Sequence, residues 1–178
     1  MKSAFFLLLF AVTLSGCVTY QALPYETSRA NTAAIKDSGI GPVAVVPFTS
    51  SHPGMTSLSC RAAGPVQAAP SFQGYIERAF IDELKLAGVY DPSSSLRLGG
   101  RLEDIQFSSG MSDGGWTLIL TLSNDRNESY IVKSTHNFDG SFFGDIACNQ
   151  VKDQLSPAVQ ALIRDLIRDP RFKTLAKQ

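Results

Sequence analysis

The sequence has little charge and no excess of either sign. Of its 178 residues, 18% are charged, and 16 basic side chains balance 16 acidic ones. A chain without a basic excess lacks the composition of a typical nucleic-acid-binding protein, so we expect no nucleic-acid partner. The chain is 44% apolar and 10% aromatic, which is too hydrophobic for a disordered protein. One ordinary globular domain is therefore the expectation.

Motifs that bind phosphate or activate a nucleophile are missing. The sequence contains no G-x-x-x-x-G-K-[ST] loop, no G-x-G-x-x-G loop and no G-x-S-x-G turn. Its two histidines, His52 and His136, stand alone, without a partner at metal-ligand spacing. A trio of Ser141, His136 and Asp139 could be drawn, but nearness in sequence makes such a trio easy to find by chance. We expect no catalytic residue, no metal and no cofactor, and we predict that the protein is not an enzyme.

Adjacent acids are also poor candidates for chemistry. Asp82 and Glu83 fall in a predicted helix, where neighbours point about 100° apart, and Glu103 and Asp104 fall in a predicted strand, where neighbours face opposite sides. Neither pair can share a proton or hold one substrate. We expect all four carboxylates to be solvated surface groups.

Long hydrophobic runs are absent except at the N-terminus. A short basic start is followed by the apolar run 4–14, whose last residue opens the string Leu14-Ser15-Gly16-Cys17. Eleven helical residues span roughly 16 Å, far less than the hydrocarbon core of a bilayer, so this segment is predicted to be a signal peptide. The last four residues resemble the bacterial lipobox, which implies cleavage after residue 16 and acylation of Cys17. The alternative is an ordinary secretory cleavage that leaves Cys17 as a free thiol.

The predicted lipid, such as palmitate on Cys17, sets the expected location. Several acyl chains attach a protein almost permanently, whereas a single chain binds only marginally. In enterobacterial lipoproteins an Asp after the acylated cysteine favours the inner membrane, and here that residue is Val18. We expect attachment to the outer membrane, facing the periplasm, with the inner membrane as the alternative.

Two further cysteines, Cys60 and Cys148, form an even set in a compartment that permits disulfides. A bridge between them would close a loop of about 88 residues. We predict that bridge. The alternatives are two buried thiols or half of a metal site.

The mature chain is predicted to contain a tether and one domain. Residues 17–41 have little periodicity and are rich in small polar residues, which suits a lipidated N-terminus followed by a flexible tether. The periplasmic domain then spans residues 42–178. Within it the pattern predicts a strand at 43–48, a long loop at 49–70 that contains Cys60 and a helix at 71–87. A strand at 96–107 with a bulge or kink near Gly99-Gly100, an antiparallel hairpin of 116–122 with 130–138, and a final helix at 146–168, kinked or split in two near Pro157, follow.

This order predicts an α+β fold. We expect a single domain with a small mixed four-stranded sheet, elements in the order β-α-β-β-β-α, and two helices packed on one face. Two helices on one side leave the other face of the sheet uncovered. An apolar patch on that open face or on a sheet edge would be a contact surface for a protein partner or a second copy of the chain.

The lipobox, the strand Val43-Ala44-Val45-Val46-Pro47-Phe48 and the strand-helix-strand order together resemble small Gram-negative envelope lipoproteins with a TolB-N-terminal-like or curli-secretion-lipoprotein-like α/β domain. The stretch 72–172 is also similar in layout to the uncharacterised YajG-type lipoproteins. The segments that carry this second resemblance are 82–90, 100–102, 137–142 and 168–172. The resemblance implies a non-enzymatic envelope protein and supplies no catalytic residues.

Two functions follow as hypotheses. The first is a membrane-anchored interaction or assembly module, accessory to a secretion, export or envelope-assembly system, with an envelope protein partner or a homo-oligomer. The alternative is a lipid- or glycan-binding lipoprotein that holds its ligand between sheet and helices, with Trp116 and the 49–70 loop near the mouth. A solidly packed domain would count against the second hypothesis.

Overall fold

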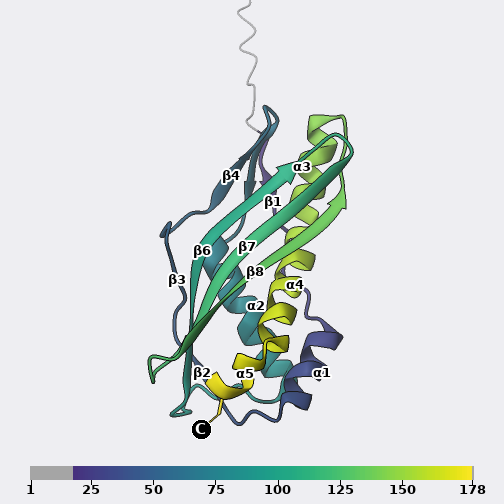
Figure 1. Cartoon of the computed structure of the whole chain (residues 1–178). Coiled ribbons are helices and arrows are strands. Elements are labelled where there is room, and N and C mark those ends of the chain that lie inside the picture. Colours follow the sequence, from purple (N-terminus) through teal and green to yellow (C-terminus); the bar gives the residue numbers. More distant parts are fainter. Residues whose placement is uncertain (1–17, 178) are drawn as a thin grey trace, which may run out of the picture.

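Three long antiparallel strands form the centre of the molecule, as the alternating sequence predicts. A computed structural model describes residues 18–177. In it β6 (Arg97–Ser109), β7 (Asp113–Asn124) and β8 (Ser129–Asp139) lie side by side (Figure 1). Leu118, Leu120 and Leu122 of β7 are fully buried, because alternate side chains of a strand share one face. The predicted hairpin is thus confirmed.

The first predicted strand is broken into two short pieces. β2 (Ala44–Val45) and β3 (Thr49–Ser50) each pair in parallel with β6, which gives the sheet order β2-β6-β7-β8 with β3 also beside β6. The bulge of β6 lies between Leu102 and Asp104 and not at the two glycines. A Cβ on Gly100 would lie 2.4 Å from the ring of Phe48. Gly100 therefore makes room for an aromatic ring from the neighbouring segment.

The helix after the long loop begins and ends where its caps predict. α2 (Phe72–Ala87) starts after Ser71, whose side chain accepts a hydrogen bond from the N–H of Gly74, and it ends at Gly88 in the left-handed conformation. The loop before α2 contains a β-hairpin of β4 (Ser57–Cys60) and β5 (Gly64–Gln67).

The C-terminal helical segment is divided in two at Gln154 and not at Pro157. α3 (Gly144–Asp153) is followed by α4 (Leu155–Arg168), and Pro157 lies in the first turn of α4, where its missing N–H costs nothing. A short α5 (Pro170–Leu175) follows. α2 and α4 pack on the same face of the central sheet (Figure 1), so the predicted single α+β domain is confirmed.

The expectation of a flexible tether is corrected, because residues 18–41 are folded. β1 (Tyr20–Gln21) pairs in parallel with β5 and completes a second sheet of order β1-β5-β4. α1 (Arg29–Ser38) packs against α2 and α4. Tyr20 and Ile35 are buried members of the main hydrophobic core. The domain therefore includes the first residues of the described chain and does not begin at residue 42.

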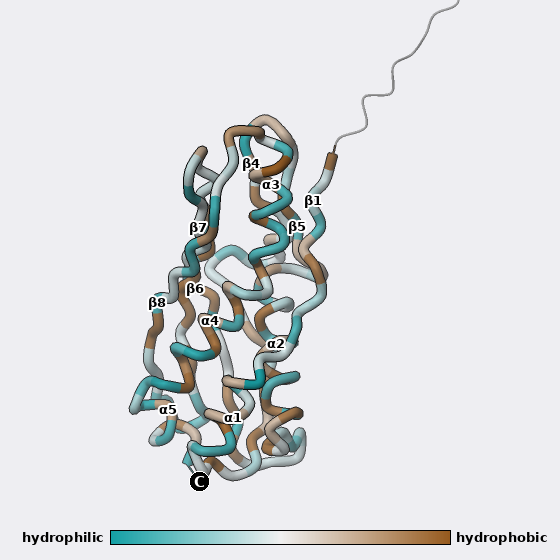
Figure 2. Tube along the Cα trace, turned by 90° about the vertical axis from the view of Figure 1, so that its right-hand side faces the viewer, coloured by the Kyte–Doolittle hydropathy of each residue, from teal (hydrophilic) through white to brown (hydrophobic). Residues whose placement is uncertain are grey.

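The domain is elongated, with different segments at its two ends. One end holds the first described residues, the β4–β5 turn, the β6–β7 turn and the start of α3 (Figures 1 and 2). The other end holds the described C-terminus and α5 (Figure 1). No helix of the described chain is both long and apolar enough to cross a membrane.

Candidate functional site

The end of the domain at which the described chain begins is the first candidate site, and we call it the tip. It consists of Val18, the β4–β5 turn (residues 61–63), the β6–β7 turn (110–112), the β8–α3 loop (140–143) and the first turn of α3. Val18 lies against the hairpin, since a Cβ on Gly64 would be 2.1 Å from the Val18 carbonyl oxygen. The predicted signal peptide (residues 1–16) and the predicted lipidation residue Cys17 lie outside the described residues.

The predicted disulfide lies directly below the tip and is confirmed. Cys60 at the end of β4 is bonded to Cys148 in α3, with their Cα atoms 5.9 Å apart. Both cysteines are fully buried. The bridge fixes the small hairpin to α3 and so holds two segments of the tip together.

Arg61 connects three segments of the tip through backbone carbonyl groups. Its Nε donates to the carbonyl oxygen of Ser109 at 2.8 Å, and its Nη2 donates to that of Gly110 at 2.9 Å. Its Nη1 reaches the carbonyl oxygen of Phe142 at 3.3 Å. Arg61 has a positive φ of 48°, an uncommon conformation for a residue with a side chain. The guanidinium thereby joins turns that are far apart in sequence.

Exposed apolar side chains gather at the tip. Of the eight large hydrophobic side chains that are exposed in residues 18–177, five lie there: Val18, Met111, Phe142, Phe143 and Ile146. Phe142 is 73% exposed and Phe143 63%, and their rings make an edge-to-face pair with centroids 5.8 Å apart. In Figure 2 hydrophobic segments alternate with hydrophilic ones at this end. Neighbouring exposed aromatic side chains are typical of a contact surface.

The open face of the central sheet is mostly polar, which differs from the expected apolar patch. Thr117, Thr121 and Thr135 point to that face, while their neighbours along the strands are buried or, at His136, half-buried. Ile131 is its one large exposed hydrophobic side chain among the described residues, at 55% exposure. β8 is an edge strand of 11 residues that pairs only with β7 in the described chain. Such an edge is a template for an added strand.

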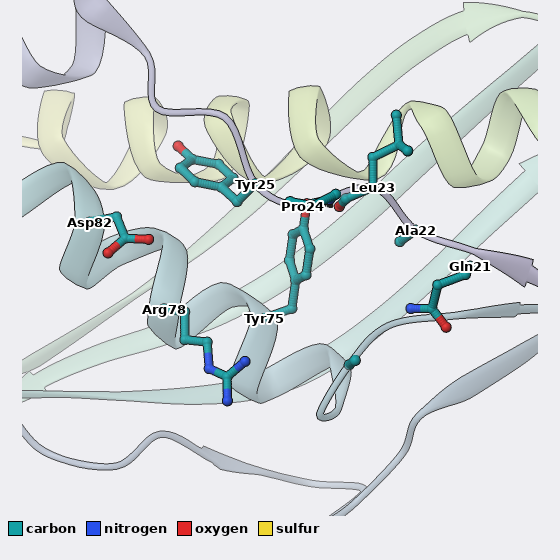
Figure 3. Close-up of a pocket in the computed structure, with 9 residues that line it drawn as sticks. Gln21, Ala22, Leu23, Pro24, Tyr25, Tyr75, Arg78 and Asp82 are labelled. Carbon is teal, nitrogen blue, oxygen red and sulfur yellow. Dashed lines mark hydrogen bonds between the residues drawn. The ribbon is translucent and has the colours of Figure 1, made fainter.

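An apolar pocket lies elsewhere, between the N-terminal segment and α2 (Figure 3). Its volume is about 340 Å³. Ala22, Leu23 and Pro24 form one wall, and the ring of Tyr75 rises from α2 against them (Figure 3). Burial raises the pKa of Tyr75 to about 12, and its hydroxyl donates to the carbonyl oxygen of Leu23 at 2.9 Å. The lining also includes Gln21, Tyr25, Ala69, Arg78 and Asp82.

A buried carboxylate lies behind this pocket and corrects the expectation of solvated acids. Glu83 is fully buried, whereas its neighbour Asp82 remains at the surface, paired with Lys85 at 3.7 Å. The Glu83 carboxylate accepts hydrogen bonds from the hydroxyl of Tyr25 at 2.7 Å and from the hydroxyl of Thr32 at 2.9 Å. It also accepts one from the N–H of Ser28 at 2.6 Å. Three donors for one carboxylate indicate a structural role, in which Glu83 joins α2 to the N-terminal segment. We call the hydrogen bonds of Glu83 with Tyr25, Ser28 and Thr32 the Glu83 clasp.

Trp116 is a core residue and does not line a ligand site. It is fully buried, its ring packs between Phe72 and Phe107, and its indole N–H donates to the carbonyl oxygen of Val151 at 2.9 Å. The space between the sheet and the helices is filled by the main hydrophobic core. The second hypothesis expects a ligand pocket between the sheet and the helices, and this expectation is therefore wrong.

The trio of Ser141, His136 and Asp139 is not assembled. The Nε2 atom of His136 hydrogen-bonds the side chain of Gln154 at 2.8 Å, and the Ser141 hydroxyl accepts from the N–H of Phe143. In residues 18–177 no group of three or more His, Cys, Asp or Glu side chains is placed to hold a metal ion. Sequence reasoning missed the tip and the Glu83 clasp. Apart from the paired phenylalanines at 142–143, no local signal marks either.

Comparison with known proteins shows the fold. No protein-family model matches the chain, and no curated protein matches it in sequence. Protein XCC0632 of Xanthomonas campestris, assigned to the family model DUF330, matches with a TM-score of 0.55 and 11% identity over 84% of this chain and 95% of that chain. Hypothetical protein CT253 of Chlamydia trachomatis matches with a TM-score of 0.44 and 9% identity, over 77% and 98% of the two chains. A candidate lipoprotein of Caulobacter crescentus matches with a TM-score of 0.38 and 13% identity, over 82% and 93%. The chain therefore shares its α+β fold with the Xanthomonas protein.

Proposed function

We propose that this protein is a lipoprotein held by acylated Cys17 on the periplasmic face of the outer membrane. There it acts as a non-enzymatic interaction or assembly module, accessory to a secretion, export or envelope-assembly system. One observation carries the proposal: a domain with a buried Cys60–Cys148 bridge is already folded at Tyr20, three residues after the lipobox-like Cys17. Disulfides persist in oxidising compartments such as the periplasm.

The sequence resemblance to TolB-N-terminal-like, curli-secretion-lipoprotein-like and YajG-type lipoproteins supports this proposal. The open sheet offers a surface for the partner. β8 is a long edge strand, and the adjacent face carries threonines around the exposed Ile131. A strand of an envelope protein, or β8 of a second copy, could pair with such an edge through main-chain hydrogen bonds.

Intact-mass analysis of the chain from a Gram-negative host tests the anchor. We expect a mature chain that begins at Cys17 and carries acyl chains, and a Cys17→Ser chain that carries none and is released from the membrane. An unacylated wild-type chain would refute the anchor.

A photo-crosslinking residue tests the partner surface. We place it at Ile131 on the open face, and as a control at Leu86 on α2, which is similarly exposed at 53%. A partner or a second copy captured from intact envelopes at 131 and not at 86 supports the module. Equal capture at both positions, or capture at neither, argues against this surface.

The apolar pocket supports a second candidate function, the carriage of a small lipid or glycan. A volume of about 340 Å³ falls within the range of small-ligand sites, and Arg78 and Asp82 supply polar groups in the lining. Mass spectrometry of organic extracts of the purified protein tests this. We expect a bound molecule that an Arg78→Ala variant retains less well. An empty pocket in the wild-type protein would remove this candidate.

A further inference from the structure

The covalent chain fixes which end of the domain faces the membrane, if Cys17 is acylated as proposed above. Residues 17 and 18 are joined by one peptide bond, so their Cα atoms are about 3.8 Å apart. β1 follows almost at once and is held in register with β5, with Tyr20 opposite Val66. Tyr20 is only 5% exposed. This arrangement leaves almost no free chain between the acylated residue and the tip.

The side chains at the tip suit the membrane interface. Met111 is 68% exposed on the β6–β7 turn, and Phe142 and Phe143 are exposed on the β8–α3 loop. Ile146, at 47% exposure, follows in the first turn of α3. Together with Val18 they come from separate segments that meet only in the folded protein. Large apolar side chains beside a lipid anchor add buried apolar area to the attachment.

Several backbone groups of the tip are hydrogen-bonded within the protein, which lowers the cost of removing them partly from water. Unpaired carbonyl groups are costly in an apolar layer. Arg61 donates to the carbonyl oxygens of Ser109, Gly110 and Phe142. The N–H of Gly140 donates to the carbonyl oxygen of Ser112 at 3.1 Å, and the N–H of Ser141 to that of Gly110 at 3.2 Å. The backbone groups of these turns therefore hydrogen-bond one another and depend less on water.

The charges near the tip limit the depth of contact. The segments that form the tip carry three exposed carboxylates, those of Asp113, Asp139 and Asp145. The positively charged side chain beside them is that of Arg61. Carboxylates are excluded from hydrocarbon and repelled by anionic headgroups. A zwitterionic interface, entered only by the apolar side chains, is the surface that this distribution fits.

We propose that the tip inserts Met111, Phe142, Phe143 and Ile146 shallowly into the leaflet that holds the acyl chains of Cys17. The lipid anchor and the tip then form two attachments at one end of an elongated domain. The domain stands away from the membrane, and β8 and the open sheet face remain free along its side (Figure 1).

The experiment uses the full acylated chain in zwitterionic vesicles, with bromine on the lipid acyl chains to quench nearby tryptophan fluorescence. Phe143→Trp reports on the tip, and Ile131→Trp, at 55% exposure on the open face, is the matched control. The buried Trp116 gives the same background in both proteins. Side chains at the interface lie within reach of the upper acyl chain, so we expect brominated lipid to reduce the added fluorescence of Phe143→Trp roughly twofold or more. The Ile131→Trp signal should not change.

Three other results would overturn the proposal. An unquenched Phe143→Trp signal from acylated, vesicle-bound protein removes the insertion and leaves the anchor intact. Equal quenching of both variants means that the domain lies on its sheet face. A chain without acyl groups removes the anchor of the proposed function together with this inference. Because residue 143 is exposed, Phe143→Trp leaves the core unchanged, and an unaltered circular dichroism spectrum confirms that the variant is folded.

Discussion

The hydroxyl of Tyr25 donates a 2.7 Å hydrogen bond to the fully buried carboxylate of Glu83, across 58 residues of sequence. The N–H of Ser28 and the hydroxyl of Thr32 donate to the same carboxylate. This clasp fastens the N-terminal segment to α2, so it also positions the first described residues relative to the core. The N-terminal segment is thus held on the domain in two ways, by the Glu83 clasp and by the strand pairing between β1 and β5.

Glu83→Gln should therefore destabilise the protein strongly. The glutamine side chain keeps the shape of glutamate but carries no charge. Its NH₂ group is a hydrogen-bond donor and replaces an oxygen atom that accepts, so it would face other donors. Hydrogen bonds to a charged group contribute about 1.5–3 kcal/mol each, so we expect the free energy of unfolding to fall by about 2–4 kcal/mol in a urea titration. Asp82→Asn is the control, because its surface ion pair contributes little. Equal effects of the two substitutions would contradict the clasp.

Stability should also fall in alkaline solution. Burial raises the pKa of Tyr25, Tyr75 and Tyr130 in the folded protein, to about 12 for Tyr75. In the unfolded chain these phenols titrate near pH 10, so the unfolded state loses protons first. The stabilisation is complete below about pH 10 and is lost as the pH rises through the folded pKa values, by up to about 1.4 kcal/mol per pH unit for each tyrosine. Urea titrations between pH 9 and pH 12 (a range set by these pKa values) measure the slope, and Tyr75→Phe should make it shallower. A stability that is flat above pH 10 would contradict this.

The disulfide should contribute substantially to stability. Cys60 and Cys148 are separated by 88 residues. In the chain-entropy model a loop of this length stabilises the folded state by about 4.6 kcal/mol. We expect the Cys60→Ala/Cys148→Ala variant to show a loss of that size in thermal and chemical unfolding, and a wild-type protein treated with a reductant to show the same loss. A change below about 1 kcal/mol in both would mean that the packing of α3 on the hairpin suffices without the bridge.

The sequence predicted the elements that have strong local signals. α2 has a capping serine, an apolar stripe and a terminal glycine, and β7 alternates without interruption. The sequence pattern of the N-terminal segment predicts a tether and not a helix, because the segment buries polar side chains. In α1 the buried residues are Asn31, Thr32 and Ile35, so the segment shows no hydrophobic stripe. The side-chain amide of Asn31 is satisfied by the carbonyl oxygen of Gln160 in α4, a partner 129 residues away.

The candidate sites were harder to predict for the same reason. The tip joins segments near residues 18, 61, 111 and 142, and its unity depends on hydrogen bonds from Arg61 that no local pattern indicates. The charge of Glu83 suggested solvent, yet tertiary partners compensate for its burial. Cysteine pairing was predictable because only two candidates remained once Cys17 was assigned to the lipid. Long-range partners therefore decide the parts of the molecule that local propensity leaves open.

Gly64→Ala should detach the first described residues from the tip. Gly64 has a φ of 137°, and a Cβ there would lie 2.1 Å from the carbonyl oxygen of Val18. The methyl group must displace backbone, so β1 should separate from β5, with faster amide hydrogen exchange at Tyr20 and Gln21 and little change in α4. Gly144→Ala is the control from the same tip, where an added Cβ would lie 3.8 Å from the side chains of Arg61 and Ala63, an ordinary contact distance. If exchange at β1 is unchanged in Gly64→Ala, the contact between Val18 and the hairpin is not what holds β1. The short link between residue 17 and the tip would then lose its structural basis.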